Sequence, residues 1–506
     1  MDLVSLPLFL TIFFIIMLLT LGANFRKKKS QTPKLPPGPW KLPLIGNLHQ
    51  LVGRVPHRVL TDMARKYGPI MHIQLGEVST VVVSSPEMAK EVMKTHDINF
   101  ATRPPIMATE IMAYNTSNIT FAPYGDYWRR LRKMCASELL SQSRVQSFRH
   151  LREEETSNLI RWIASNEGSV INLTEKINSS TYASASRAAF GNKSPKLETF
   201  IHTVLEFTKL ASGFNIGDAY PSIKFLHVIS GMKSKLMKHL KVTDSILHAI
   251  LNEHKVSGLF AKTENPDQAH KDFVDVLLQY HEDENAEFSM TNDNIKAVLL
   301  DAFIAGGGTS AKTLNWAMTE LVRNPRIMEK ARNEVREVFK NKGRVDETCF
   351  DQLKYLKLVI KETLRLHPPG PLLLPRISNE KCIINGYEIP AKTKLLVNAF
   401  AINRHPSYWE DAETFYPERF LGSPINYKGK HFEYIPFGAG RRMCPGILLG
   451  LVNVEHLLAK FLYHVDWKLP NGMKPEDMDM TEDFGLALTR KDDLYLIPMV
   501  KNPPPV

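Results

Sequence analysis

The chain begins with an almost unbroken apolar stretch and then changes to mixed patterns. Residues 3–23 carry nearly uninterrupted apolar side chains, and the basic cluster Arg26–Lys29 follows directly. A helix of about 20 apolar residues crosses a bilayer, so the stretch predicts a single transmembrane anchor. Positive charge on its C-terminal side places the rest of the chain in the cytoplasm. A cleaved signal peptide would carry its positive charge ahead of the apolar stretch, so the pattern favours a retained anchor.

Beyond the anchor, residues 24–45 are basic and rich in proline, which predicts an extended, semi-rigid hinge. From about residue 60 to the end, no stretch has the composition of a linker. We therefore expect one large domain over 46–506, although a chain of 506 residues often holds several. A hydrophobic fraction of 43% with 23% charged residues is typical of a globular protein with a sizeable core.

Within this domain, short alternating segments predict hairpins and longer periodic segments predict helices. Ile70–Leu75 and Thr80–Ser84 are rich in β-branched residues, as the strands of a hairpin are. A second hairpin is expected where Asn385-Gly386 separates 381–384 from 387–389. Helical periodicity dominates most of the rest, so the fold class is mainly α with small β-sheets.

The longest predicted helix starts from a cap at Thr291 and runs to about Asn324, where Pro325 follows. Its middle contains Gly306–Gly308, and each glycine inside a helix costs about 1 kcal/mol relative to alanine. One interpretation is that a ligand lies against this segment and the helix bulges there. The alternative is a break between two shorter helices.

Candidate chemistry concentrates in the glycine-rich segment Phe437–Gly446, which contains one cysteine, Cys444. Pro445 and the apolar run after it predict that a helix begins immediately. Cys444 would then lie beside free backbone N–H groups and the positive end of a helix dipole, which stabilise a thiolate. Such a sulfur is suited to binding a haem iron from one side.

Charge and cysteine usage narrow the class of partner. The formal net charge is +11, with no basic repeat or zinc-finger spacing, so we expect no nucleic acid partner. The excess of positive charge suits an anionic membrane surface or an acidic protein. The 4 cysteines form no Cys-x-x-Cys pair, which argues against a disulfide framework or a zinc site and indicates a reducing compartment.

The pattern Phe-Gly-x-Gly-x-Arg-x-Cys-x-Gly at 437–446 resembles the cysteine-ligand loop of the cytochrome P-450 family. The resemblance extends along the chain through a Trp-x-x-x-Arg helix, a Glu-x-x-Arg helix and the motif Pro417–Phe420. It implies the cytochrome P-450 fold, with haem b held through its iron by the Cys444 thiolate. The residues expected to bind the cofactor are Trp128, Arg132, Arg376, Phe437, Arg442, Cys444 and Gly446. A structural brace for the loop is expected from Glu362, Arg365 and Arg419.

The family's oxygen-activation motif matches Ala305, Gly306, Thr309 and Ser310. Thr309 and Ser310 are therefore the candidate catalytic residues, and Ala305 and Thr309 share a helix face with Asp301. The chain departs from the motif at Gly308, where the family has an acid that organises proton delivery. Without this acid, protons must come through Thr309, Ser310, water or the substrate. The departure also motivates an alternative function, a haem-thiolate isomerase or dehydratase that needs no reductase.

The resemblance is strongest to plant microsomal members that oxidise terpenoids. It implies a single-pass enzyme of the endoplasmic reticulum membrane, acting as a monomer on a small apolar substrate. Dioxygen is the oxidant, and NADPH supplies electrons through NADPH–cytochrome P-450 reductase. Hydroxylation, or oxidation with ring closure, is the expected reaction; alkaloid or phenolic oxidation and a silent carrier are the alternatives. The expected substrate pocket comprises Ile106, Met107, Ile111, Phe121, Ala302, Ala305, Leu372, Leu373 and Phe484.

Overall fold

The computed structural model describes residues 34–191, 197–212, 215–261, 271–282, 289–485 and 487–504. The predicted anchor at 3–23 and the first part of the predicted hinge lie outside these residues. Within the described ranges, no helix is both long enough and apolar enough to cross a bilayer.

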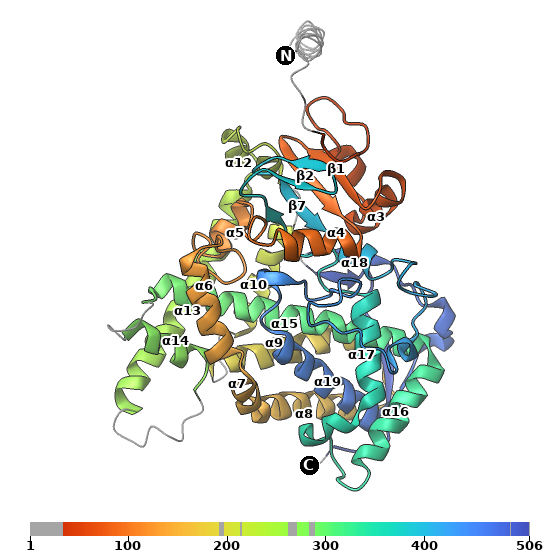
Figure 1. Ribbon diagram of the computed structural model, residues 1–506. Coiled ribbons are helices and arrows are strands. Elements are labelled where there is room, and N and C mark those ends of the chain that lie inside the picture. Colours follow the sequence, from red (N-terminus) through yellow and green to blue (C-terminus); the bar gives the residue numbers. More distant parts are fainter. Residues whose placement is uncertain are drawn as a thin grey trace, which may run out of the picture.

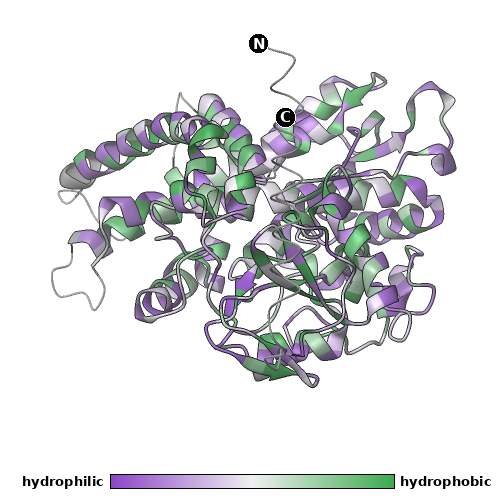
Figure 2. Cartoon of the chain, turned by 90° about the horizontal axis from the view of Figure 1, so that it is seen from above, coloured by the Kyte–Doolittle hydropathy of each residue, from purple (hydrophilic) through white to green (hydrophobic). Residues whose placement is uncertain are grey.

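The helices form the larger part of the molecule, and the main sheet lies at the end where the described chain begins (Figure 1). Many helices show hydrophobic and hydrophilic residues alternating along the ribbon, as expected for helices that bury one face (Figure 2). The bounds are α2 Leu48–Leu51, α3 Pro56–Tyr67, α4 Pro86–Lys90, α5 Met107–Met112, α6 Asp126–Met134, α7 Gln142–Ser147, α8 Arg149–Ser165, α9 Leu173–Phe190, α10 Leu197–Ser212, α11 Ile216–Ala219, α12 Phe225–Ile229, α13 Met232–Ala261, α14 Phe273–Glu282, α15 Asn292–Arg323, α16 Pro325–Phe339, α17 Lys354–Leu366, α18 Ala399–Ile402 and α19 Ile447–His464.

The main sheet has the strand order β1-β2-β7-β4. Strands β1 and β2 form the antiparallel hairpin predicted from the sequence, with Ile70 opposite Val83. Strand β7 runs parallel to β2, and β4 is antiparallel to β7. The predicted hairpin around Asn385-Gly386 is also present, as β5 and β6. The bounds are β1 Ile70–Leu75, β2 Val78–Val83, β3 Ile171–Asn172, β4 Arg376–Ile377, β5 Cys382–Ile384, β6 Tyr387–Ile389, β7 Lys394–Val397, β8 Val465–Lys468, β9 Glu482–Phe484, β10 Leu488–Arg490 and β11 Tyr495–Val500.

Helix α15 crosses the middle of the molecule, and α9, α17 and α19 pack against it (Figure 1). The predicted cap is confirmed: the Thr291 side chain accepts from the Asn294 backbone N–H, and the Asn294 side chain accepts from the Thr291 N–H. The helix stays α-helical through Gly306–Gly308 to Arg323. Both the predicted bulge and the alternative break are therefore wrong. The presence of three glycines is therefore not explained by an irregularity of the helix.

The start of α19 also differs from the prediction. The helix begins at Ile447, with Gly446 as its N-cap, so Pro445 lies two positions ahead of the first helical residue. From there the apolar positions of α19 are buried against α15, α16 and α17, as Leu457 and Leu458 show. This packing fixes the position of the loop 437–446 at the helix N-terminus.

Candidate active site

The loop 437–446 depends on glycine for its path. Gly438 and Gly440 both have φ of 70°, a left-handed conformation that side chains disfavour. A Cβ atom on Gly440 would also lie 2.2 Å from the carbonyl oxygen of Met93. The backbone N–H of Cys444 donates to the carbonyl oxygen of Phe437 at 3.0 Å, which closes the loop.

Cys444 receives a hydrogen bond on its sulfur from the backbone N–H of Gly446. Burial nevertheless raises the pKa of the thiol, and the charge of Asp301 adds to this, while Gly446 and the charge of Arg132 lower it. The prediction that the N–H groups stabilise a thiolate identified the right donors but left out the cost of burial. A metal cation at the sulfur would supply the positive charge that a buried thiolate needs.

Two of the predicted cofactor-binding residues, Arg132 and Arg442, lie beside this loop together with Trp128. Arg132 donates from Nη2 to the carbonyl oxygen of Met443 at 2.7 Å. The Arg442 guanidinium lies 4.2 Å from the centroid of the Trp128 ring and donates from Nε to the Ala101 carbonyl oxygen at 2.6 Å. Helix α6 therefore positions Trp128 and Arg132 against the cysteine loop, as their spacing predicted.

Arg376 reaches the same loop from β4. Its Nη1 donates to Asp97 Oδ1 at 3.0 Å, and its Nη2 donates to the Ala439 carbonyl oxygen at 3.0 Å. Asp97 also accepts from the backbone N–H of Arg441 at 2.9 Å, and it is buried. Asp97 is thus part of the site, although no motif in the sequence distinguishes it.

Arg103 is a second site residue without a sequence signal. It is buried, and it donates to the carbonyl oxygens of Thr120 at 3.0 Å and Leu374 at 2.8 Å. Burial lowers the pKa of Arg103 well below its usual value, and the charges of Arg376 and Arg442 add to the shift. Burial and the same kind of repulsion lower the pKa of Arg442 to about 9.

Buried guanidinium groups that repel one another favour an anion between them. A cofactor that offers a metal ion to the Cys444 sulfur and carboxylates to these arginines would supply both the cation that the thiolate needs and the anions that the guanidinium groups need. The residues present therefore fit a haem, with Cys444 as the iron ligand and Arg103, Arg132, Arg376 and Arg442 as partners for its propionates.

Helix α15 has one face with small, exposed residues. Ala305 and Thr309 are exposed, although their neighbours Phe303, Gly307 and Ser310 are buried. The Thr309 hydroxyl donates to the Ala305 carbonyl oxygen at 2.7 Å. Small residues here leave room beside the helix, as expected for the oxygen side of a haem.

Asp301 lies further along α15 and is buried. It accepts from Thr120 through the backbone N–H at 3.0 Å and the hydroxyl at 2.6 Å. Burial raises its pKa to about 6 in spite of these hydrogen bonds. Asp301 therefore connects α15 to the segment after α5.

Ser310 faces a different direction from Thr309. Its hydroxyl is buried and has no hydrogen-bond partner among the described residues. A Cβ atom on Gly450 would lie 3.9 Å from Ser310 Oγ, so the hydroxyl faces α19. The structure thus separates the two hydroxyls that the sequence grouped as candidate catalytic residues.

The predicted brace residues come together in a buried cluster. Glu362 accepts from Arg365 Nε at 2.8 Å and from Arg419 Nε at 2.9 Å. Arg365 also donates to the Asn403 carbonyl oxygen at 3.0 Å, and the Asn403 side chain accepts from the Ile435 N–H at 3.2 Å. Through Asn403 the cluster connects to the residues just ahead of the cysteine loop.

A comparison with known families agrees with this geometry. The family model described as cytochrome P450 matches residues 36–497. The chain belongs to the cytochrome P450 family. It is therefore an oxidoreductase of the monooxygenase type, and the family's haem-thiolate cofactor is the group that the site fits.

Relatives and solved structures support the assignment. The chain is 51% identical to premnaspirodiene oxygenase of Hyoscyamus muticus, over 98% of this chain and 97% of that protein. It is 53% identical to salviol synthase of Salvia pomifera, over 92% of each chain. A solved zebrafish cytochrome P450 structure with progesterone has a TM-score of 0.76 at 23% identity, covering 88% of this chain and all of that one, and supports the fold.

The predicted pocket residues of this cytochrome P450 fall into separate groups. Ile106, Met107 and Ile111 pack with Phe207 and Leu236 beneath α10 and α13. Leu372 lies instead in the core beside the main sheet, whereas Leu373 approaches the cysteine loop, 3.7 Å from where a Cβ on Gly438 would lie. Phe121 is half-buried, Ala302 borders a crevice towards α9 and α19, and the side chain of Phe484 is outside the described residues.

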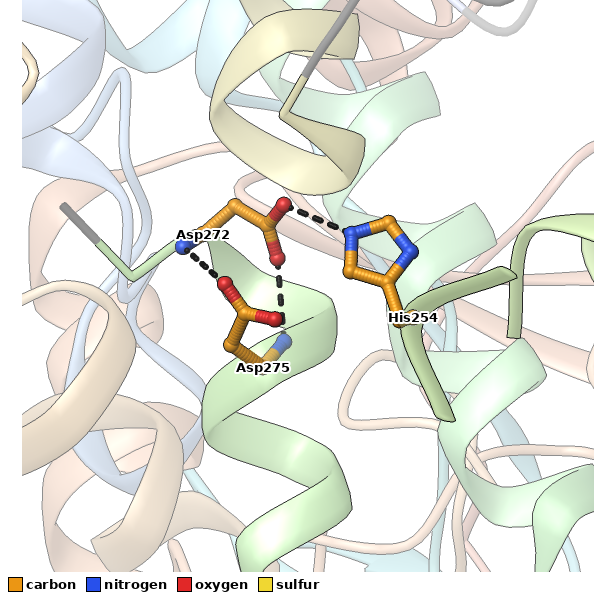
Figure 3. A group of neighbouring side chains, drawn as sticks. All are labelled: His254, Asp272 and Asp275. Atoms are coloured by element: carbon orange, nitrogen blue, oxygen red, sulfur yellow. Dashed lines mark hydrogen bonds and ion pairs between the residues drawn. The ribbon is translucent and has the colours of Figure 1, made fainter. Parts of the chain in front are cut away.

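A second cluster of titratable groups, His254, Asp272 and Asp275, joins the end of α13 to the start of α14 (Figure 3). Asp272 and Asp275 each accept from the other's backbone N–H, at 2.9 and 3.1 Å, a reciprocal cap on α14. His254 Nε2 lies 2.9 Å from Asp272 Oδ2, and Nδ1 lies 2.9 Å from the Ile250 carbonyl oxygen. These contacts explain the cluster as a helix cap with an ion pair.

Proposed function

We propose that this cytochrome P450 hydroxylates an apolar terpenoid with O2, using electrons from NADPH that a reductase delivers. The Cys444 loop with Arg132 and Arg442 beside it, together with the exposed Ala305 and Thr309 of α15, carries the proposal. A bound haem supplies the iron that accepts these electrons and activates O2. The names of the two relatives, premnaspirodiene oxygenase and salviol synthase, support a terpenoid substrate.

In this proposal each side chain has a limited task. Cys444 would be the iron ligand, and the N–H of Gly446 would help to stabilise its thiolate. The arginines would neutralise the propionates, and the Trp128 ring packs against the Arg442 guanidinium. Thr309 offers a hydroxyl on the exposed face of α15. The apolar residues Ile106, Met107 and Leu373 would exclude water and favour a hydrocarbon substrate.

An exposed basic surface beside the cysteine loop supports the reductase as partner. Arg129, Arg130 and Lys133 are exposed on α6, the helix whose Arg132 contacts Met443. Arg441, inside the loop, is exposed as well. An acidic flavoprotein would meet complementary charge next to the Cys444 side of the site.

An exposed apolar surface supports association with a membrane of the endoplasmic reticulum. On and beside α12, Phe225 is 65% exposed, Val228 71% and Ile229 59%. Trp40 and Leu44, near the start of the described chain, are 72% and 67% exposed. The two segments are in contact, since Tyr220 donates to the Leu44 carbonyl oxygen at 3.3 Å. Apolar groups of this size are typical of a surface that lies in a lipid interface.

The test is to incubate microsomes that contain the enzyme with reductase, NADPH and a panel of terpenoids, alkaloids and phenolics. We expect a hydroxylated terpenoid by mass spectrometry, with an oxygen atom that comes from labelled O2. Product formed without NADPH or O2 would instead support the isomerase or dehydratase. In a Cys444→Ala variant, we expect the red-shifted Soret band of the reduced carbon monoxide complex to disappear. An unchanged band would overturn the ligand assignment.

A further inference from the structure

The glycines of α15 make room for one side chain of α9. A Cβ atom on Gly307 would lie 2.5 Å from Cδ1 and 2.8 Å from Cε1 of Tyr182. A Cβ atom on Gly308 would lie 2.9 Å from the Tyr182 hydroxyl oxygen. Cβ atoms essentially never lie within 3.0 Å of a neighbouring heavy atom, so a side chain at 307 or 308 would force Tyr182 to shift.

The Tyr182 hydroxyl therefore lies next to the place where a side chain at position 308 would begin. An acid is expected at this position from the oxygen-activation motif, and the chain has Gly308 instead. The hydroxyl is the polar group that the structure offers there. It forms no hydrogen bond with any of the described residues, so it is free to bind water.

The surroundings of Tyr182 hold it in place and keep it neutral. The residue is 5% exposed, and its ring centroid lies 5.2 Å from that of Phe303. Burial raises the pKa of the hydroxyl to about 12, so it remains a hydrogen-bond donor near neutral pH. A neutral donor can orient water without giving up its own proton.

A mostly apolar crevice with a few polar side chains lies near this position. Further along the two helices, Ala185 and Gly306 border a crevice that Arg152, Ser184 and Asn453 also line. The side-chain oxygen of Asn453 is buried without a partner among the described residues. A buried polar atom of this kind is ordinarily satisfied by water.

We propose that Tyr182 takes the place of the missing acid at position 308, as a positioning residue that orients water beside the oxygen helix. The inference rests on the monooxygenase function. In that reaction, two protons and two electrons reduce one atom of O2 to water while the other enters the substrate. The protons come from solvent through the ordered water, and Tyr182 is neutral before and after each turnover.

The first experiment compares Tyr182→Phe with Tyr280→Phe in the full-length enzyme. The first change removes the hydroxyl and keeps the ring; the second does the same for a half-buried tyrosine packed against the same core cluster. For Tyr182→Phe we expect about 2- to 10-fold less product per NADPH, more hydrogen peroxide and a larger solvent isotope effect. Tyr280→Phe should match the wild type. Unchanged coupling and isotope effect in a folded, haem-loaded Tyr182→Phe variant would overturn the proposal.

A second experiment tests the geometry without using activity. Gly308→Ala should lower the melting temperature of the wild type, because its Cβ meets the Tyr182 hydroxyl. In the Tyr182→Phe background the nearest remaining Tyr182 atom, Cζ, lies 3.8 Å away. There the same change should raise the melting temperature by about 1–3 °C through helix propensity. Equal shifts in both backgrounds would contradict the placement of the hydroxyl.

These outcomes separate this inference from the proposed substrate. If no terpenoid is oxidised, the stability comparison still tests the position of the hydroxyl. Peroxide release with NADPH and reductase alone likewise still compares the two tyrosine variants. If a terpenoid is oxidised and Tyr182→Phe behaves as the wild type, the proposed function stands and the role of Tyr182 fails.

Discussion

The cysteine loop and the oxygen helix are both rich in glycine, for different physical reasons. In the loop, Gly438 and Gly440 adopt φ of 70°, and Gly440 also approaches the Met93 carbonyl. In α15, Gly307 and Gly308 have ordinary helical conformation and leave space for Tyr182. The loop needs glycine for its backbone, whereas the helix needs it for its neighbour.

The difference shows how each region tolerates change. A backbone in the left-handed region is strained by any side chain, whatever surrounds it. A helical glycine that faces a neighbour can be replaced once the neighbour becomes smaller. The stability lost on substituting a loop glycine should therefore not be restored by a second substitution nearby. The stability lost on substituting Gly307 or Gly308 should be restored by a smaller side chain at Tyr182.

The largest effect is expected at the brace that supports the loop. Glu362→Ala leaves Arg365 and Arg419 buried without their carboxylate, and should cost about 3–5 kcal/mol of stability. Glu329→Ala is the control, because Glu329 belongs to the chain's other Glu-x-x-Arg pattern and is exposed. It should change stability by less than about 0.5 kcal/mol. Urea unfolding measures both variants, and equal losses would contradict the role of the buried cluster.

Gly440→Ala should be nearly as severe. The change combines positive φ with a Cβ atom 2.2 Å from the Met93 carbonyl oxygen, and we expect a loss of about 3 kcal/mol or more. Gly422→Ala has the same φ of 70° with nothing within 4 Å of its Cβ, and should cost about 1 kcal/mol. Thermal unfolding and haem content are measured for both variants. A loss no larger for Gly440→Ala would show that the loop backbone can shift.

Gly307→Ala and Gly306→Ala give the matching test in the helix. The first places a Cβ 2.5 Å from the Tyr182 ring and should cost about 1–3 kcal/mol. The second has only Ala185 Cβ at 4.0 Å, so helix propensity should stabilise the protein by up to about 1 kcal/mol. Thermal unfolding of both variants shows whether the two stability changes have opposite signs. Two losses of equal size would mean that position 306 is also constrained.

The last prediction concerns the ion pair of His254 and Asp272, beside Gly191 at the end of α9, where positive φ and a close neighbour occur at one glycine. Gly191 has φ of 74°, and its Cβ would lie 2.5 Å from Asp272 Oδ2. Burial alone would lower the pKa of His254, but the hydrogen bond and charge of Asp272 raise it to about 9 from 6.5. The ion pair therefore stabilises the protein fully below pH 6.5 and is lost as the pH rises towards 9.

We expect this loss to amount to about 1–3 kcal/mol, and His254→Gln should abolish it. Melting temperatures measured between pH 6 and pH 9.5 for the wild type and His254→Gln provide the check. Parallel curves for the two proteins would contradict an ionised His254 in the folded state.

Much of the fold and part of the site could be predicted from local patterns. The Thr291 cap, both hairpins and the spacing of Trp128 and Arg132 appear where the sequence placed them. The buried cluster of Glu362 also has the predicted members. In each case the signal lies in neighbouring residues, because caps, turns and helix faces depend on short separations along the chain.

The misses involve residues that meet only after folding. Asp97 reaches the loop through the Arg441 N–H, and Arg103 reaches the Pro375 carbonyl oxygen beside Arg376; no neighbour in sequence marks either of them. The pKa of the Cys444 thiol depends on burial, which the N–H count at a helix start does not include. The separation of Ser310 from Thr309 depends on which face of α15 meets α19.

The sequence by itself determined the elements, the sulfur ligand loop and the family, because periodicity, turn residues and motif spacing are local properties. Only the tertiary structure decided why α15 carries glycine at both 307 and 308. That cause lies in Tyr182, more than 120 positions earlier in the chain, and it acts through the packing of α9 on α15. Exclusion of one side chain by another requires the two helices to be in contact, and a linear pattern does not contain that contact.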